Sequence, residues 1–378
     1  MFAIPTLSFS RTLSLLIGML ALTAAAAASA QDAANATDPA AIATLPTTVV
    51  VSGEQPGPGL WRVSKDGHQM WVLGTLLPLP KRMEWNGTEV EQRIEQSSAY
   101  LHQPGLNFSV KGGMFRALFL LPSIMKTRNN PDKQKLQDVL SAEDYQRWLV
   151  LKQQYIGRSR SVEKRRPLVA AQDLMEKAIR KNDMTLDNFV AKRVRKLADR
   201  AKLEQIRPNI EIRFEDPKQA LNEFNTTQLE DTECFRRMLD RVGGEIEQMK
   251  LRANAWAVGE IDILRQLTIT QTYRSCADAL LETKVAERYG LGQIEQRLRE
   301  EWLNKAEETL ATHATSFALL PMPLVVGEDS FLDRLVERGY RVQAPNELEE
   351  AVQPSDLADA GAAPSARDEL RDELVEQP

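Results

Sequence analysis

Histidine and cysteine are scarce in this chain of 378 residues, which contains three of the first and two of the second. The histidines, His68, His102 and His313, are far apart, and no His-Glu-x-x-His zinc-binding helix occurs. The cysteines, Cys234 and Cys276, form no Cys-x-x-Cys pair. The sequence also lacks the Gly-x-Ser-x-Gly and Gly-x-x-x-x-Gly-Lys patterns. These absences exclude the commonest zinc-protease, α/β-hydrolase and P-loop motifs.

Long hydrophobic runs are missing too. The strongest one, Leu13–Leu22, is shorter than the roughly 20 residues that span a bilayer. It follows Arg11 and precedes Ala28-Ser29-Ala30, which is the order of a secretory signal peptide rather than of a membrane anchor. We therefore expect cleavage after Ala30 and a mature chain that is periplasmic or secreted, without a membrane span.

Charge is distributed unevenly. Residues 346–378 contain ten acidic and two basic residues, a formal charge of −8, and no aromatic residue, which predicts an acidic tail that is disordered or loosely helical. The mature sequence before this tail carries about +2. Its one basic concentration, Gly157–Pro167, has no interleaved aromatic residues, so we expect a solvated loop and no nucleic-acid partner.

The segment 31–58 is small and polar, ends in a Gly- and Pro-rich stretch, and predicts a flexible linker before a folded domain at 59–345. "LWRVSKDGHQMWVLGTLL" predicts a hairpin that turns at Asp66-Gly67, because these residues accept the positive φ of a tight turn. "TEVEQRIEQSS" then predicts a helix and "AYLHQ" a short strand.

Helical patterns fill the middle of the chain. Ser141 precedes Asp144 by three residues, a capping arrangement at the start of "LSAEDYQRWLVLKQQY". A later helix has an apolar stripe of Phe189, Val190, Val194, Leu197 and Ala201. "TSFALLPMPLVV" and "YRVQAP" read as strands near the C-terminal end. The pattern predicts an α/β fold, one domain with strands from both ends of the chain and a large helical middle.

Several segments together resemble one protein family. They are "GLWRV…QMWVLGTLLPLP", "RRPLVAAQDL", "ALNEFNTTQLEDTECF", "NAWAVGEIDIL" and "FALLPMPLVVGEDSFLDRLVERGYRVQAP". In this order they resemble TraB/GumN proteins, whose relatives include the TIKI metalloproteases. The resemblance implies a site with a divalent metal, held by the histidines of two Gly-x-x-His motifs and by a glutamate on the strand after the first helix.

Matched to that pattern, leucine stands at both histidine positions. The first motif falls on Gly74-Thr75-Leu76-Leu77 and the second on Pro321-Met322-Pro323-Leu324, while the glutamate position falls at His102 or Gln103. Leucine neither binds a metal nor transfers a proton. We therefore expect no cofactor, no metal and a vestigial site whose two leucines meet at neighbouring strand ends, where they close the cleft or leave an apolar groove. Its residues are Gly74, Thr75, Leu77, His102, Gln103, Pro321 and Leu324.

The two cysteines are expected to form a disulfide. An exported chain meets oxidising conditions, and Cys234 and Cys276 lie in two helical stretches that flank "NAWAVGEIDIL". Such a bridge would stabilise the fold by roughly 3 to 4 kcal/mol in the chain-entropy model.

Two classes of function follow. The first is a catalytically inactive family member, retained in the cell envelope as a binding or scaffold protein for a peptide, protein or glycan. The alternative is a hydrolase or peptidase of the TraB/TIKI type with an altered site around His102 and Gln103. The loss of the motif histidines favours the first class.

Overall fold

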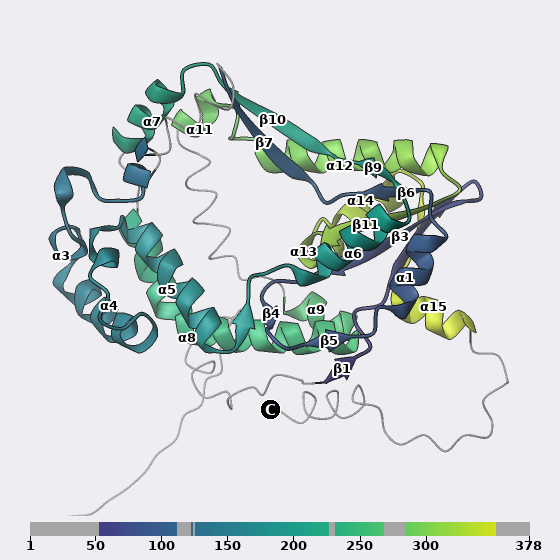
Figure 1. The fold of residues 1–378 in the computed structure, drawn as a ribbon, viewed down its shortest axis with the longest axis horizontal. Helices are drawn as coiled ribbons and strands as arrows, with labels where there is room; N and C mark the ends of the chain where they lie inside the picture. The colour runs from purple at the N-terminus through teal and green to yellow at the C-terminus, as the bar shows by residue number, and fades with distance from the viewer. Residues whose placement is uncertain (1–52, 112–121, 124, 227–230, 268–283, 353–378) are drawn as a thin grey trace, which may run out of the picture. The chain divides into compact units, whose positions relative to one another are not determined.

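The computed structural model describes residues 53–111, 122–123, 125–226, 231–267 and 284–352 (Figure 1). Within these residues, a six-stranded sheet forms the centre of a mixed α/β fold, and strands from both ends of the chain contribute to it, as predicted. The expected signal peptide at 1–30 lies outside the described residues.

The central sheet has the strand order β12-β2-β3-β11-β6-β9. Strands β3, β11, β6 and β9 run parallel to one another, whereas β2 is antiparallel to both β3 and β12. The predicted hairpin is confirmed as β2 and β3, with Asp66 and Gly67 both at positive φ in the turn. The strands are β2 (Trp61–Lys65), β3 (His68–Thr75), β6 (Ala99–Leu101), β9 (Glu204–Ile206), β11 (Thr315–Pro321) and β12 (Arg341–Gln343).

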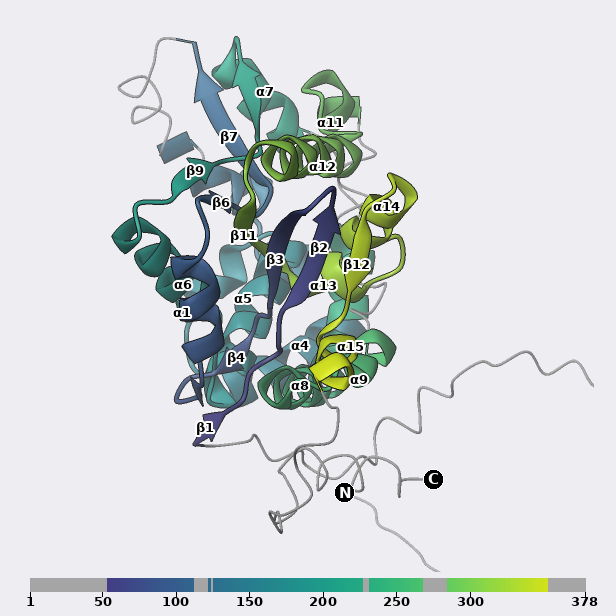
Figure 2. The same ribbon diagram turned by 90° about the vertical axis from the view of Figure 1, so that its right-hand side faces the viewer.

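Helices cover the sheet on both sides (Figure 2). Helices α1 (Thr88–Glu95) and α6 (Phe189–Arg200) contact each other, and α1 also contacts β11. On the other side, α12 (Ile294–Thr312) contacts β3, β6 and β11, and it packs beside α14 (Phe331–Glu337). Every residue of β6 and the middle of β11 is buried, because such parallel strands lie between two layers of helices.

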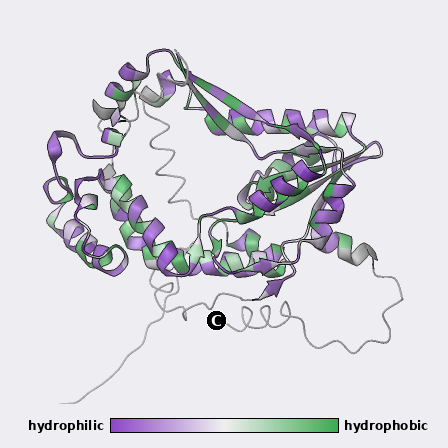
Figure 3. Ribbon diagram, viewed as in Figure 1, coloured by the Kyte–Doolittle hydropathy of each residue, from purple (hydrophilic) through white to green (hydrophobic). Residues whose placement is uncertain are grey.

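The predicted helical middle is present. Its longest helix, α8, packs along α5 and also contacts α4 and α9. Figure 3 shows hydrophobic residues alternating with hydrophilic ones along α5 and α12, as expected for helices with one buried side. The helices are α3 (Leu136–Val139), α4 (Ala142–Tyr155), α5 (Pro167–Lys181), α8 (Asp231–Val258) and α9 (Ile261–Gln266), with short 3₁₀ turns η2 (Pro131–Lys133) and η3 (Ser161–Lys164).

Local signals located these helices well. Ser141 caps α4 by accepting a hydrogen bond from the Asp144 backbone N–H at 3.1 Å. In α6, Val190 and Val194 are buried as predicted, whereas Ala201 is exposed just after the helix ends.

Smaller elements complete the described chain. Strands β1 (Glu54–Gln55) and β5 (Glu84–Trp85) pair in parallel, β4 (Leu79–Pro80) and β8 (Met184–Thr185) pair in antiparallel, and β7 (Gly105–Val110) and β10 (Asn209–Phe214) form a parallel ribbon. The remaining helices are α7 (Pro217–Thr226), α11 (Lys284–Arg288), α13 (Met322–Val326) and α15 (Pro345–Val352).

The structure corrects two sequence expectations and shows the helical alternative at the start of a third segment. The predicted linker is part of the fold from Glu54, because β1 pairs with β5 and the Gly57 N–H donates to Ala257 at 2.8 Å. The tail, expected to be disordered or loosely helical, begins as helix α15, whose Leu348 packs against the core; residues 353–378 lie outside the described chain. The basic stretch is more than a solvated loop, since it forms η3 and buries both Glu163 and Arg166.

In the described part of the chain, no helix is both long enough and apolar enough to span a bilayer.

Candidate functional site

The two segments matched to the family motifs follow neighbouring strands. Strands β3 and β11 pair in parallel along their whole shared length, and Thr75 lies opposite Pro321 at their carboxyl ends. The Thr75 hydroxyl is buried and donates to the Leu320 carbonyl at 3.3 Å. Gly74, Thr75 and Pro321 are therefore brought together where parallel α/β sheets commonly place their binding sites.

The motif leucines do not close this site. Leu77 is 40% exposed in the loop after β3, and Leu324 is partly buried in α13. Their neighbours Leu76 and Met322 are the buried residues, with 4% and 2% of their surface exposed. The expectation that Leu77 itself packs into the cleft is wrong, because the chain turns after Thr75 and directs Leu76 inward instead.

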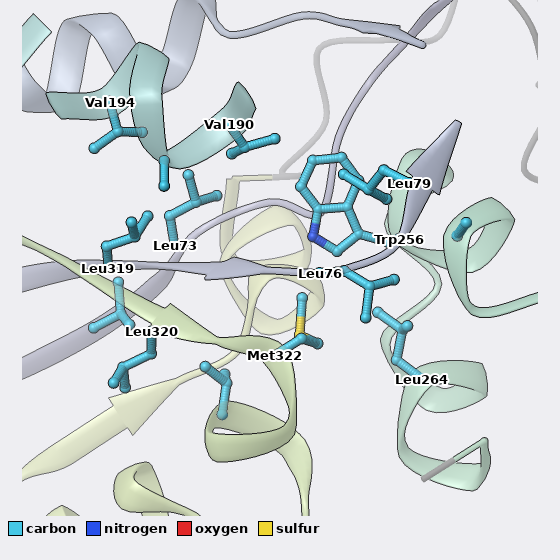
Figure 4. Close-up of a cluster of buried hydrophobic side chains, with 14 of the residues drawn as sticks. Leu73, Leu76, Leu79, Val190, Val194, Trp256, Leu264, Leu319, Leu320 and Met322 are labelled. Carbon is cyan, nitrogen blue, oxygen red and sulfur yellow. The ribbon is translucent and has the colours of Figure 1, made fainter. Parts of the chain in front are cut away.

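Met322 and Trp256 seal the end of β3 from two directions (Figure 4). A Cβ atom added to Gly74 would lie only 2.6 Å from the Met322 Cε atom, so the absence of a side chain lets the methionine cover the strand. The buried Trp256 of α8 donates its Nε1–H to the Gly74 carbonyl at 2.8 Å. Its ring also packs edge-on against Trp85. Gly74 therefore allows Met322 to pack closely against the end of β3.

A cavity of about 20 Å³ remains at this closed strand end, enough for about one water molecule. Most of its lining is apolar, and the only charged member among the described residues is Arg252. The lining residues are Leu76, Arg252, Leu264, Leu267, Met322, Pro323, Val326 and Gly327.

Arg252 is a polar residue of the site that sequence reasoning missed. It is 7% exposed, donates from Nη1 to the Leu267 carbonyl at 3.3 Å, and lies 3.7 Å from a Glu245 carboxylate oxygen. Burial lowers the pKa of Arg252, while the charge of Glu245 opposes this shift. A usable signal was present, since Arg252 precedes the buried Trp256 by one helical turn and therefore shares its face of α8.

His102 follows β6, the strand on the other side of β11. Pairing between these strands ends at Leu101 opposite Ala318, three residues before Pro321. The His102 Nε2 lies 2.8 Å from the Gln205 side-chain oxygen, and its carbonyl accepts a hydrogen bond from Trp302 at 3.1 Å. The neighbouring Gln103 is exposed.

Burial is the main cause that lowers the pKa of His102 below its usual value. The charges of Arg207 and Arg195 act in the same direction, and the hydrogen bond with Gln205 opposes them. The imidazole is therefore neutral at neutral pH and held by an amide side chain.

The residues do not fit the metal that the family resemblance implies. A hydrolytic metal commonly has about three protein ligands and one open position. Here Leu77 and Leu324 supply no ligand atom, which leaves the single imidazole of His102, fewer than the three ligands required. No cluster of three or more histidine, cysteine or acidic side chains suited to a metal ion occurs anywhere in the described residues.

The other singled-out residues lie elsewhere. His68 contacts the Leu310 carbonyl at 2.5 Å, and His313 caps the end of α12, where its ring lies 2.9 Å from the Ser98 hydroxyl. Cys234 is buried in α8, whereas Cys276 lies outside the described residues, so their bridge stays a prediction.

Comparison with known proteins identifies one family over most of the described fold. No match is found among curated proteins or among solved structures. The model of the TraB/PrgY/gumN family matches residues 59–344, which include the central sheet, the helical middle and both strand ends described above. The chain therefore belongs to the TraB/PrgY/GumN family.

Proposed function

We propose that this chain is an exported family member that acts by binding, as a pseudoenzyme of the cell envelope. One observation carries the proposal: at the ends of β3 and β11 the motif histidine positions hold leucine, and Leu76 and Met322 fill the space between them. A water-sized cavity leaves no room there for a peptide bond and an attacking water.

Ligand chemistry supports the same conclusion. The family resemblance implies two imidazoles and a carboxylate around a divalent metal, whereas this chain offers one engaged imidazole and an exposed amide, His102 and Gln103. The one charged side chain in the described lining of the strand end, Arg252, has no lone pair to offer a metal ion. An apolar, closed strand end with a buried guanidinium is the opposite of a hydrolytic metal site.

The alternative is an altered hydrolase around His102 and Gln103. A neutral imidazole is the form that a general base requires, and burial keeps His102 neutral. The one side chain that hydrogen-bonds its ring in the described residues, Gln205, is an amide and therefore neither nucleophile nor acid. The binding proposal therefore has the stronger support.

A metal and activity assay tests the proposal. The purified chain is dialysed, its zinc, manganese and cobalt are quantified by mass spectrometry, and cleavage of a fluorogenic peptide library is followed with and without chelator. We expect substoichiometric metal and no chelator-sensitive cleavage. Stoichiometric metal or chelator-sensitive cleavage would overturn the proposal.

A variant separates the two candidate functions. Hydrolysis that resists chelator but disappears in His102→Gln, at an unchanged melting temperature, would favour the altered hydrolase. Hydrolysis that persists in this variant would come from a contaminant or another site. A parallel screen of peptides and glycans by calorimetry searches for the ligand.

Export is the remaining part of the proposal, and it follows from the order of Arg11, the apolar run and Ala30. Intact mass of the chain from the native envelope should show a mature protein that begins at Gln31. A chain that begins at Met1 in the cytoplasm would contradict export.

A further inference from the structure

A second hollow, of about 470 Å³, lies where the turn η2 meets the start of α5. All charged residues among its described lining are cationic, and two amide side chains accompany them. The lining includes Lys126, Asn129, Asn130, Lys133, Lys164 and Arg166. It shares no residue with the closed end of β3 and β11.

Backbone pairing fixes two walls of this basic pocket relative to each other. Asn129 and Arg165 form an isolated antiparallel bridge. Beside it, Asn130 donates its backbone N–H to the Lys164 carbonyl at 2.9 Å and its side-chain amide to the Arg165 carbonyl at 2.8 Å. The Arg166 N–H donates to the Arg128 carbonyl at 3.0 Å. The pocket is therefore built before any ligand arrives, which lowers the entropy cost of binding.

Two carboxylates close to the basic stretch, Asp173 and Glu163, are already engaged by other residues. Asp173 lies 3.2 Å from Arg128 and 3.6 Å from Arg165. The buried Glu163 pairs with Lys152 at 2.6 Å and accepts a hydrogen bond from a tryptophan. Among the described residues, no carboxylate lies within ion-pair distance of the pocket's three lysines, so their charges are available to a ligand.

The backbone of η2 is strained where it presents one of these lysines. Asp132 and Lys133 have φ of 53° and 59°, a region that costs a non-glycine residue free energy, and they occupy it consecutively. Persistent strain of this kind often marks a binding or catalytic site, and here it places Lys133 in the lining of the pocket.

An adjoining hollow of about 290 Å³ extends the cationic surface. It shares Lys126 with the basic pocket and adds Lys218, Ser123 and Asn222. Lys126 thus stands between two hollows, each with at least one further cation. This arrangement suits a ligand with two anionic groups joined by a short link.

We propose that the basic pocket binds a small ligand with two phosphate groups, or one phosphate and a second anion. A phosphate offers several acceptor oxygens and a double negative charge, which match a pocket lined by three lysine ammonium groups better than a single carboxylate does. The volume lies in the range of small-molecule sites.

Calorimetric titration of the full chain with sodium pyrophosphate at low salt tests this site. We expect saturable binding that the double variant Lys126→Gln/Lys164→Gln weakens at least about 10-fold, because two charge-assisted contacts are removed. Both side chains are exposed, so melting temperature should be unchanged.

The control with the same change of charge is Lys192→Gln/Lys305→Gln, at an exposed lysine of α6 and a partly exposed lysine of α12, each of which pairs with a nearby carboxylate. It should bind pyrophosphate within about twofold of the wild type if binding is localised. No saturable binding, or an equal loss in both double variants, would overturn the proposal.

A second arm identifies the source of the phosphate. The wild type and the two double variants are tested for co-sedimentation with phosphatidylcholine vesicles that contain cardiolipin, a lipid whose headgroup carries two phosphates. Pyrophosphate binding without vesicle binding indicates a free phosphorylated ligand, and vesicle binding that depends on Lys126 and Lys164 indicates a lipid headgroup. Either outcome supports the site, and vesicle binding that ignores these lysines contradicts the headgroup as its source.

Discussion

The contact between Gly74 and Met322 allows the closure of the strand end to be measured. In Gly74→Ala, the new Cβ would lie 2.6 Å from the Met322 Cε and 2.8 Å from its Sδ, distances that force a displacement. Gly74 is not at positive φ, so the penalty is steric rather than conformational. Overpacking of this kind typically destabilises a core by about 1 to 3 kcal/mol.

A second substitution, Met322→Ala, leaves the space beside Gly74 empty. Met322→Ala removes a side chain that is 2% exposed and should cost about 2 to 5 kcal/mol. In the double variant, the methyl group at position 74 enters the space that the methionine leaves. Its steric penalty then disappears, and the double variant should be more stable than the sum of the single effects by about 1 to 3 kcal/mol.

Urea unfolding followed by circular dichroism provides the four free energies of this cycle. Gly243→Ala is the matched control, because a Cβ there meets no atom within 4 Å and the residue lies in helix α8. It should stabilise the chain by up to about 1 kcal/mol and combine additively with Met322→Ala. If the effects of Gly74→Ala and Met322→Ala also add to within about 0.5 kcal/mol, the packing argument is refuted.

Three further predictions concern single residues or pairs. Trp256→Phe should destabilise the chain by about 1 to 3 kcal/mol more than Trp71→Phe in urea unfolding, because the first loses a hydrogen bond whereas the buried Trp71 Nε1 has no acceptor among the described residues; equal losses would contradict this. The lowered pKa of His102 means that the unfolded chain binds a proton more readily, so the free energy of unfolding should fall as the pH drops below about 6.5. His102→Gln should flatten that dependence, and an unchanged slope would speak against it. Reduction of the Cys234–Cys276 bridge should cost roughly 3 to 4 kcal/mol, and two titratable thiols in the unfolded, non-reduced chain would show that no bridge exists.

Local patterns predicted much of the fold. The turn at Asp66-Gly67 fixed the first hairpin, and the cap at Ser141 located the start of α4. Such signals act over a few residues, so they can be read without knowing the tertiary structure. The family resemblance supplied the longer-range expectation that both motif segments follow strand ends, and β3 and β11 are indeed neighbours.

The details of the site depend on contacts between distant residues. Nothing local decides whether Leu76 or Leu77 turns inward, since both are leucines after the same strand. The choice depends on Met322, which lies about 250 residues later in the chain. Arg252 was missed for the same reason, because its role follows from the helix face that meets the strand end.

The structure of the basic stretch, Gly157–Pro167, also depends on contacts that its sequence alone does not predict. Its composition predicts exposure, and Lys164 is indeed exposed. The structure adds that Glu163 points inward to Lys152 and that a backbone bridge joins the stretch to Asn129. The basic stretch therefore forms a wall of the basic pocket because its backbone pairs with a distant segment at Asn129.

The two sites lead to one physical argument about binding. At the strand ends, Met322 and Trp256 occupy the space that a substrate would need, and a closed core contributes stability that an open polar cleft lacks. The remaining hollow of about 20 Å³ is the size of about one water molecule. If this protein acts by binding, recognition must therefore use another surface. The basic pocket, with its fixed walls and available lysines, has the volume and the charge to do so.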